Sequence, residues 1–191
     1  KNVVDPGSII DQYGADTARW FMLSDSPPER DLEWTEAGVQ GAWRFTNRLW
    51  RLVLGSLNQL APAGNVSGGT GDDAMRRAVH KTIIAVSEDL DALRFNRAVA
   101  RVYELANTLV DGKDLVGGVT LREGIETLVR LVAPMMPHLA EELWQRLGHD
   151  TVLAEEAWPA ADTALAVDDN VTIAVQVAGK LRGTLEVPMG M

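Results

Sequence analysis

The sequence predicts a mainly α-helical bundle that ends in a β-hairpin. Up to residue 160, apolar residues recur at the three- and four-residue spacing of helices, and Gly-containing stretches interrupt that pattern at 61–71 and 111–118. Beyond Trp158, apolar and polar residues alternate with the period of a half-buried strand. Because a lone hairpin is only marginally stable in water, we expect residues 168–191 to begin a truncated α+β domain.

Two short helices are predicted at the N-terminal end. Ser8 follows a turn and is a suitable N-cap for a helix over 9–13, which Gly14 would close. Asp16 is the expected N-cap of the second helix, and Pro27 ends it because proline lacks the backbone N–H. The apolar residues of this second helix are Ala18, Phe21 and Met22.

A long helix is predicted from Thr35, a plausible N-cap, to about Leu60. Its apolar face consists of Val39, Ala42, Trp43, Leu49, Trp50, Val53, Leu57 and Leu60. Tryptophan side chains can stack on exposed nucleic-acid bases. Trp43 and Trp50 stand at helical spacing among aliphatic residues, so we expect them in the core instead.

Two further helices are predicted in the middle of the chain. The first begins at Asp72 or Asp73, and a break around 94–96 separates it from the second, which runs to Val110. The apolar face of the first consists of Met75, Val79, Ile83, Val86 and Leu90. The apolar face of the second consists of Ala98, Val99, Val102, Leu105, Ala106 and Leu109.

The last two helices flank a pair of prolines. Thr120 is the expected N-cap of a helix that ends at Val132. After a bend between the prolines, the final helix covers 138–147 and Gly148 closes it. The alternating residues that follow predict two strands around a turn that contains Gly179.

The composition is that of an ordinary soluble globular protein, with 46% hydrophobic and 24% charged residues among 191. No run of eighteen apolar residues occurs, so we predict no transmembrane helix. The absence of Cys excludes disulfides and thiol catalysis. No signal-peptide pattern is seen, and the expected localisation is cytoplasmic. The net charge of −9 argues against general nucleic-acid binding unless basic residues gather locally.

No catalytic motif is present. Gly68-Gly69-Thr70-Gly71 lacks the strand that precedes a phosphate-binding loop, so a linker is predicted there. The three His residues have no ligand-like spacing and are expected to pack, cap or face solvent. Adjacent carboxylates such as Glu141 and Glu142 point in different directions on a helix, which favours a solvated face. We therefore predict no catalytic residue, no metal site and no cofactor in this chain.

Basic residues in three groups are the best candidates for binding. The long helix carries Arg44, Arg48 and Arg51 at i, i+4 and i+7; a later helix carries Arg94, Arg97 and Arg101; the hairpin carries Lys180 and Arg182. The arginine guanidinium suits phosphate because it donates two parallel hydrogen bonds. The alternative is that both arginine rows pair with Asp and Glu on neighbouring helices.

Several motifs occur in a specific order along the chain. They are NVVDP at 2–6, YGADTAR at 13–19, PPERDLEW at 27–34, FTNRLW at 45–50, LRFNRA at 93–98, LVAPMMPHLAEELW at 131–144 and VQVAGKLRG at 175–183. Together they resemble the bacterial-type leucyl-tRNA synthetases, which are class I aminoacyl-tRNA synthetases. The last motif is the discriminating one, although the family commonly has Asn where this chain has Ala178.

This resemblance implies a domain organisation. Residues 1–34 would be a connector after the signature loop of a catalytic domain. Residues 35–160 would form a helical bundle of the class I synthetase anticodon-binding-domain type, and 168–191 would open the C-terminal domain. Because the chain starts at Lys1 in mid-motif, we expect it to be an excised piece of a larger enzyme.

The resemblance also implies a role. The three basic groups would contact the stem and corner of leucine tRNA, beside the enzyme's own catalytic domain and without DNA or membrane. The intact enzyme would use ATP and Mg to join leucine to its tRNA, whereas this chain lacks the catalytic and editing regions and would be inactive alone. Two alternatives stay open: a valyl- or isoleucyl-type bundle, which the hairpin disfavours, and a helical protein-interaction module.

Overall fold

The computed structural model describes residues 4–64, 72–167, 170–177 and 180–188. The α-helices are α1 (Pro6–Tyr13), α2 (Ala15–Asp25), α3 (Glu36–Ser56), α4 (Asp73–Asp91), α5 (Phe95–Gly112), α6 (Gly118–Val132) and α7 (Pro137–Arg146). Two 3₁₀ turns, η1 (Leu57–Gln59) and η2 (Leu153–Glu155), and the strands β1 (Asn170–Val177) and β2 (Lys180–Pro188) complete the elements. The predicted helical bundle with a C-terminal β-hairpin is thus confirmed.

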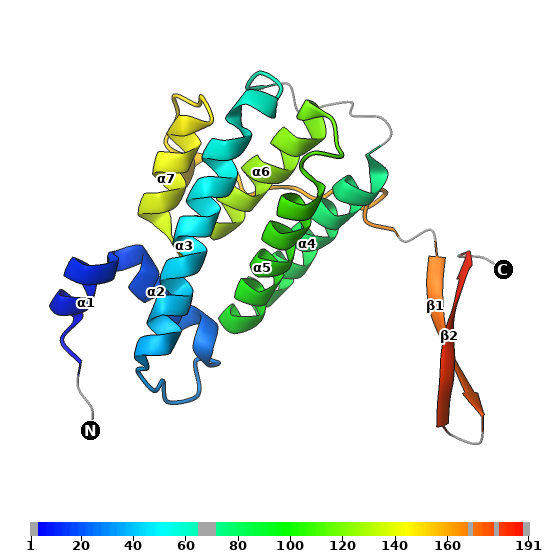
Figure 1. Cartoon of the computed structure of the whole chain (residues 1–191), viewed down its shortest axis with the longest axis horizontal. Coiled ribbons are helices and arrows are strands. Elements are labelled where there is room, and N and C mark those ends of the chain that lie inside the picture. The colour runs from blue at the N-terminus through cyan, green and yellow to red at the C-terminus, as the bar shows by residue number, and fades with distance from the viewer. Residues whose placement is uncertain (1–3, 65–71, 168–169, 178–179, 189–191) are drawn as a thin grey trace.

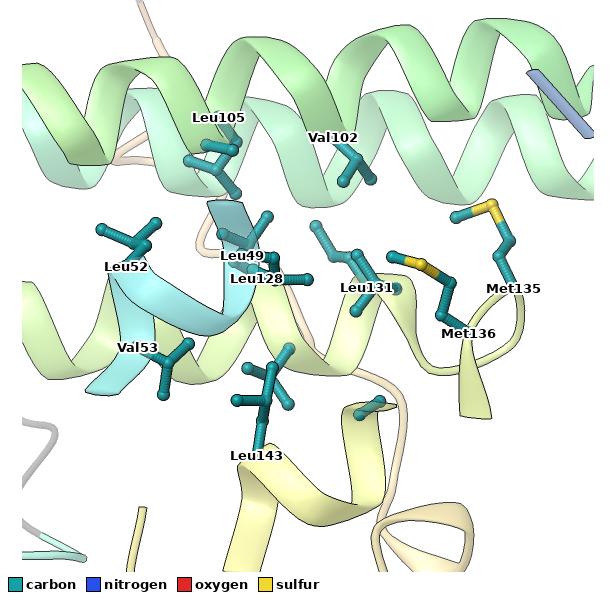
Figure 2. Packing of buried hydrophobic residues seen from close by; sticks show 14 of the residues in the cluster. Leu49, Leu52, Val53, Val102, Leu105, Leu128, Leu131, Met135, Met136 and Leu143 are labelled. Atoms are coloured by element: carbon teal, nitrogen blue, oxygen red, sulfur yellow. The ribbon is translucent and has the colours of Figure 1, made fainter. Parts of the chain in front are cut away.

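Helix α6 lies in the middle of the bundle, with α4 and α5 on one side and α7 on the other (Figure 1). Most of its residues are buried, because the helix is covered on several sides. Its Leu128 and Leu131 are fully buried. Figure 2 shows them between leucine and valine side chains of α3 and α5 above and Leu143 of α7 below. Within the described ranges, no helix is long and apolar enough to cross a membrane.

Several predicted boundaries are confirmed. The Thr35 hydroxyl accepts a hydrogen bond from the backbone N–H of Gly38 at 3.3 Å, as expected of an N-cap. The predicted break after α4 occurs, and Leu93 turns the chain there with a φ of 55°. Strands β1 and β2 pair antiparallel. The predicted linker at 68–71 and the turn at 178–179 lie outside the described residues.

Three predicted N-caps are wrong. Helix α2 starts at Ala15 after Gly14, so Asp16 lies inside the helix and does not cap it. Asp5, not Ser8, caps α1: its carboxylate accepts from the N–H of Gly7 at 3.1 Å, and Pro6 starts the helix three residues earlier than expected. Helix α6 starts at Gly118, so Thr120 lies inside the helix. A side chain at Gly118 would come within 2.5 Å of the Gln59 carbonyl oxygen, so this start depends on the close approach of η1.

The apolar face of α2 also differs from the prediction. Met22 is 58% exposed, whereas Trp20 is fully buried and stacks on Phe45 at a ring-centroid distance of 4.8 Å. The expectation for the two tryptophans of α3 is only partly met. Trp43 is 41% exposed and meets Tyr13 edge-on, while Trp50 is partly buried. The spacing predicted that the whole width of this apolar stripe is buried. In the structure, neighbouring helices bury only the centre of the stripe.

Residues 152–167 form a strap after α7 that polar side chains hold against the bundle. Glu141, expected on a solvated face, accepts from the backbone N–H groups of Leu153 and Ala154 at 2.9 Å each. The Trp158 indole donates to the Ser87 hydroxyl at 2.8 Å. Because most of these bonds reach the backbone of the strap, its path depends on the residues of the helices beneath it.

The three histidines pack, make polar contacts or face solvent, and none belongs to a metal site among the described residues. His80 Nδ1 accepts from the backbone N–H of Asp162 at 3.1 Å in the strap. His138 Nδ1 lies 2.8 Å from a carboxylate oxygen of Asp16. The His149 ring stacks on Trp144 with centroids 3.6 Å apart.

Candidate nucleic-acid interface

The arginines of α3 lie on one side of the helix without a carboxylate partner. Arg44 and Arg51 are exposed and Arg48 is partly buried. Among the described residues, none of the three makes a hydrogen bond or an ion pair. Glu36 is the one acidic residue in the 21 residues of α3. The acidic protein therefore carries a local row of positive charge whose hydrogen-bond donors are available to an external anion.

Tyr103 of α5 lies beside this arginine row. Its hydroxyl oxygen accepts from the Trp20 indole N–H at 3.0 Å, so its own proton can be donated elsewhere. Burial raises the pKa of Tyr103, while the positive charges of Arg44 and Arg48 act to lower it. The side chain is therefore protonated at pH 7, and the charges of Arg44 and Arg48 act on it. Tyr103 could not be identified from the sequence, because its position on α5 gives no sign that α3 approaches it.

The arginines on α5 and just before its first residue form ion pairs within the protein. Arg94 and Arg97 both contact one carboxylate oxygen of Asp89, at 3.1 and 3.4 Å. Asp89 is only 3% exposed, so its charge is compensated by these two arginines. Arg101 pairs with Glu104 at 3.1 Å. The alternative of intramolecular pairing thus holds for this row, while the row on α3 has no ion pair with any residue that the structure describes.

The hairpin presents its two basic residues on β2. Lys180 and Arg182 are both exposed. In the strand register Val175 pairs with Gly183 and Gln176 with Leu181, which leaves Arg182 opposite no residue. This is the pattern of a β-bulge, which locally bends and twists the strand. The structure does not bring the hairpin residues into one site with the α3 row.

A further ion pair lies in the core and is structural. Arg122 donates to Glu126 at 2.6 Å and to the Leu147 carbonyl oxygen at 3.1 Å, and both side chains of the pair are buried. His149 completes this network at 2.8 Å from Glu126. No sequence motif singled out these residues, because an i, i+4 pair of this kind is ordinary on exposed helices.

The chemistry of the exposed row suits phosphate groups. Guanidinium groups and a phenol bind phosphate oxygens through charge-assisted and neutral hydrogen bonds. Within the part of the chain that the structure describes, no group of three His, Asp or Glu side chains is placed to hold a metal ion. The row is therefore a candidate binding surface for phosphate groups.

Comparison with known proteins places these features in context. A family described as the anticodon-binding domain of tRNA ligase matches residues 72–191. Proteins named leucine–tRNA ligase from Paramagnetospirillum magneticum and Parvibaculum lavamentivorans are 58% and 55% identical over 98% of the chain, which spans 22% of the length of each. The solved LeuRS–tRNA–LeuAMS ternary complex from Agrobacterium radiobacter K84 superposes with a TM-score of 0.90 at 28% identity, over 100% of this chain and 25% of that one.

Proposed function

The chain belongs to the family of tRNA ligase anticodon-binding domains, and we propose that it is the tRNA-binding part of a leucine–tRNA ligase. The observation that carries this proposal is the unpaired row of Arg44, Arg48 and Arg51 on α3. Relatives named as leucine–tRNA ligases support leucine over valine or isoleucine as the amino acid.

The row would bind the sugar–phosphate backbone of the tRNA stem and corner. Double-stranded RNA is recognised mostly through its shape, its phosphates and its 2′-hydroxyls, because side chains cannot read the deep, narrow major groove. A line of guanidinium groups along a straight helix is suited to that task. Tyr103 adds a neutral donor beside the line. Such binding weakens as salt rises, since each phosphate contact releases counterions.

The remaining basic groups would make secondary contacts. Arg94 and Arg97 must share their donors with Asp89, so their contribution to RNA binding is smaller than that of the α3 row. Arg101 is likewise shared with Glu104. Lys180 and Arg182 would contact the tRNA from the hairpin, at a distance from the main row.

In the intact enzyme this chain would cooperate with a catalytic domain. Residues 1–34 would form the connector to that domain, 35–160 the tRNA-binding bundle and 168–191 the start of a C-terminal domain. Leucine would be activated with ATP and Mg as leucyl-adenylate and then transferred to tRNA, in the cytoplasm.

The test is a triple substitution in the intact ligase: Arg44→Gln, Arg48→Gln and Arg51→Gln. We expect binding of leucine tRNA to weaken by about tenfold or more per lost phosphate contact. Leucine-dependent ATP–pyrophosphate exchange should be unchanged, because it needs no tRNA. Arg146→Gln, which removes one positive charge from an arginine paired with Glu142, is the control for the loss of a single charge.

Two results would separate the alternatives. Weaker tRNA binding in the triple variant, with a shallower salt dependence, supports the stem-binding function. Unchanged tRNA affinity and salt dependence would exclude the row as an RNA contact and leave the helical protein-interaction module as its explanation.

A further inference from the structure

The arginine row on α3 ends in a glycine on each side. Gly41, Arg44, Arg48, Arg51 and Gly55 are separated by three, four, three and four residues, so they share one line along the helix. The two glycines are about 21 Å apart along the helix axis.

Neither of these glycines is required by the protein's own packing. Among the residues that the structure describes, a Cβ on Gly55 would meet no atom within 4 Å, and one on Gly41 would meet only a guanidinium nitrogen of Arg44 at 3.7 Å, an ordinary contact. Neither is among the described glycines with positive φ. Gly38 on the same helix is different, because a Cβ there would lie 2.5 Å from the Phe21 ring. Packing therefore explains Gly38 and leaves Gly41 and Gly55 unexplained.

Glycine is a costly choice at these positions. In a helix it is less favourable than alanine, because it loses more backbone freedom on folding. Helix α3 nevertheless has glycine at both Gly41 and Gly55, on the same line as Arg44, Arg48 and Arg51. Close approach of the backbone to a ligand is one of the structural uses of glycine.

We propose that Gly41 and Gly55 let the ribose–phosphate backbone of the bound tRNA stem lie directly against the backbone of α3. This inference rests on the proposed function and adds two positioning residues to it. Because glycine has no side chain, the side chains that project from this line of five residues are those of Arg44, Arg48 and Arg51. The shallow minor groove of A-form RNA can then lie flat along the helix while the arginines reach phosphates.

The test is a set of single substitutions in the intact ligase, Gly41→Ala and Gly55→Ala. We expect each to weaken binding of leucine tRNA by about tenfold, because a methyl group forced into a packed contact is poorly tolerated. The temperature of unfolding should stay the same or rise by about 2–4 °C, since alanine favours the helix. Gly55→Ala is the cleaner variant, because Gly41 adjoins the Arg44 side chain.

Gly7→Ala is the matched control. Gly7 is an exposed glycine of α1, where a Cβ would meet only Asp5 carboxylate atoms at 3.4 Å or more. The same methyl group is added there, away from the row, and tRNA binding should not change.

The outcomes distinguish this inference from the function on which it rests. If Gly55→Ala binds tRNA within about twofold of the unmodified ligase while the triple arginine variant binds weakly, the inference is wrong and the proposed function stands. If the arginine variant is unaffected as well, both fail. A lowered temperature of unfolding in Gly55→Ala would also overturn the inference, because the glycine would then serve the fold.

Discussion

The Asp16 carboxylate accepts a hydrogen bond from the backbone N–H of Leu139 at 2.6 Å, although the two residues are 123 positions apart. Leu139 lies in the first turn of α7, whose N-cap residue Met136 forms no side-chain cap. Asp16, expected as the N-cap of its own helix, therefore supplies the acceptor that an unpaired N–H at the start of α7 needs. A carboxylate is also favoured there by the helix dipole.

A second residue of α2 holds the same turn. Arg19 donates to the carbonyl oxygens of Pro134 and Met135, at 2.9 and 3.2 Å. The α6–α7 turn is thus held from both sides by charged groups of one short helix. This contact joins the N-terminal segment to the bundle.

Asp16→Ala should lower the free energy of unfolding of the chain by about 1–2 kcal/mol, because the N–H of Leu139 loses its acceptor. Asp16→Asn should retain most of the stability, since the amide oxygen still accepts. Urea unfolding measures both. The control is Asp11→Ala at an exposed position of α1. Equal losses in the Asp16→Ala and Asp11→Ala variants would contradict the capping role.

Arg122→Ala should destabilise the chain by about 3–5 kcal/mol, because it removes the arginine from a buried carboxylate and leaves the carbonyl oxygens of Ala61 and Leu147 without this donor. The carboxylate is that of Glu126, which is 8% exposed. Arg101→Ala removes an exposed pair with Glu104 and should cost less than about 1 kcal/mol. Denaturant unfolding compares the two. A loss in Arg122→Ala as small as that of the control would show that His149 alone compensates Glu126.

The pKa of Tyr103 provides a pH test of the site. Burial raises this pKa above its ordinary value near 10, so the stability that Tyr103 contributes is fully present below about pH 10. That stability is lost as pH rises through the folded pKa. Absorbance of the tyrosinate, measured in a Tyr13→Phe background, reports Tyr103 alone because the chain has two Tyr.

The same titration tests the neighbouring arginines. Arg44 and Arg48 act to lower the pKa of Tyr103, so replacing both with Gln should raise it further. Arg97→Gln, whose partner is Asp89, is the control and should leave it unchanged. A pKa that does not respond to the double substitution would show that the row does not act on the phenol.

Local features of the fold could be predicted because their causes are close in sequence. The Thr35 cap on Gly38 involves a side chain three residues from its donor. The apolar faces of α4 and α5 follow from the angular spacing of residues along one helix. Where a boundary depended on another segment, as at Gly118 against η1, the prediction from Thr120 was wrong.

The sequence predicted which basic residues are candidates for the site, but not which of the two arginine rows lacks ion pairs. The sequence presents the rows beginning at Arg44 and Arg94 as equivalents, with similar spacing on a helix. The two rows differ because Arg94 and Arg97 form ion pairs with the buried carboxylate of Asp89. The charges of the first row instead act on the phenol of Tyr103. Neither relationship is visible without the packing of α4 against α5 and the position of α3.

By itself, the sequence determined the helical bundle, the hairpin, the positions of the basic residues and the resemblance to one family of tRNA ligases. These depend on residue type and on spacing within single elements. Only the tertiary structure decided which arginines are unpaired, and that Asp16 caps a helix far along the chain. It also decided which glycines on α3 have a packing reason. The physical reason is that spacing gives the angle at which a side chain leaves its helix, whereas pairing, burial and close approach depend on what another segment places at that angle.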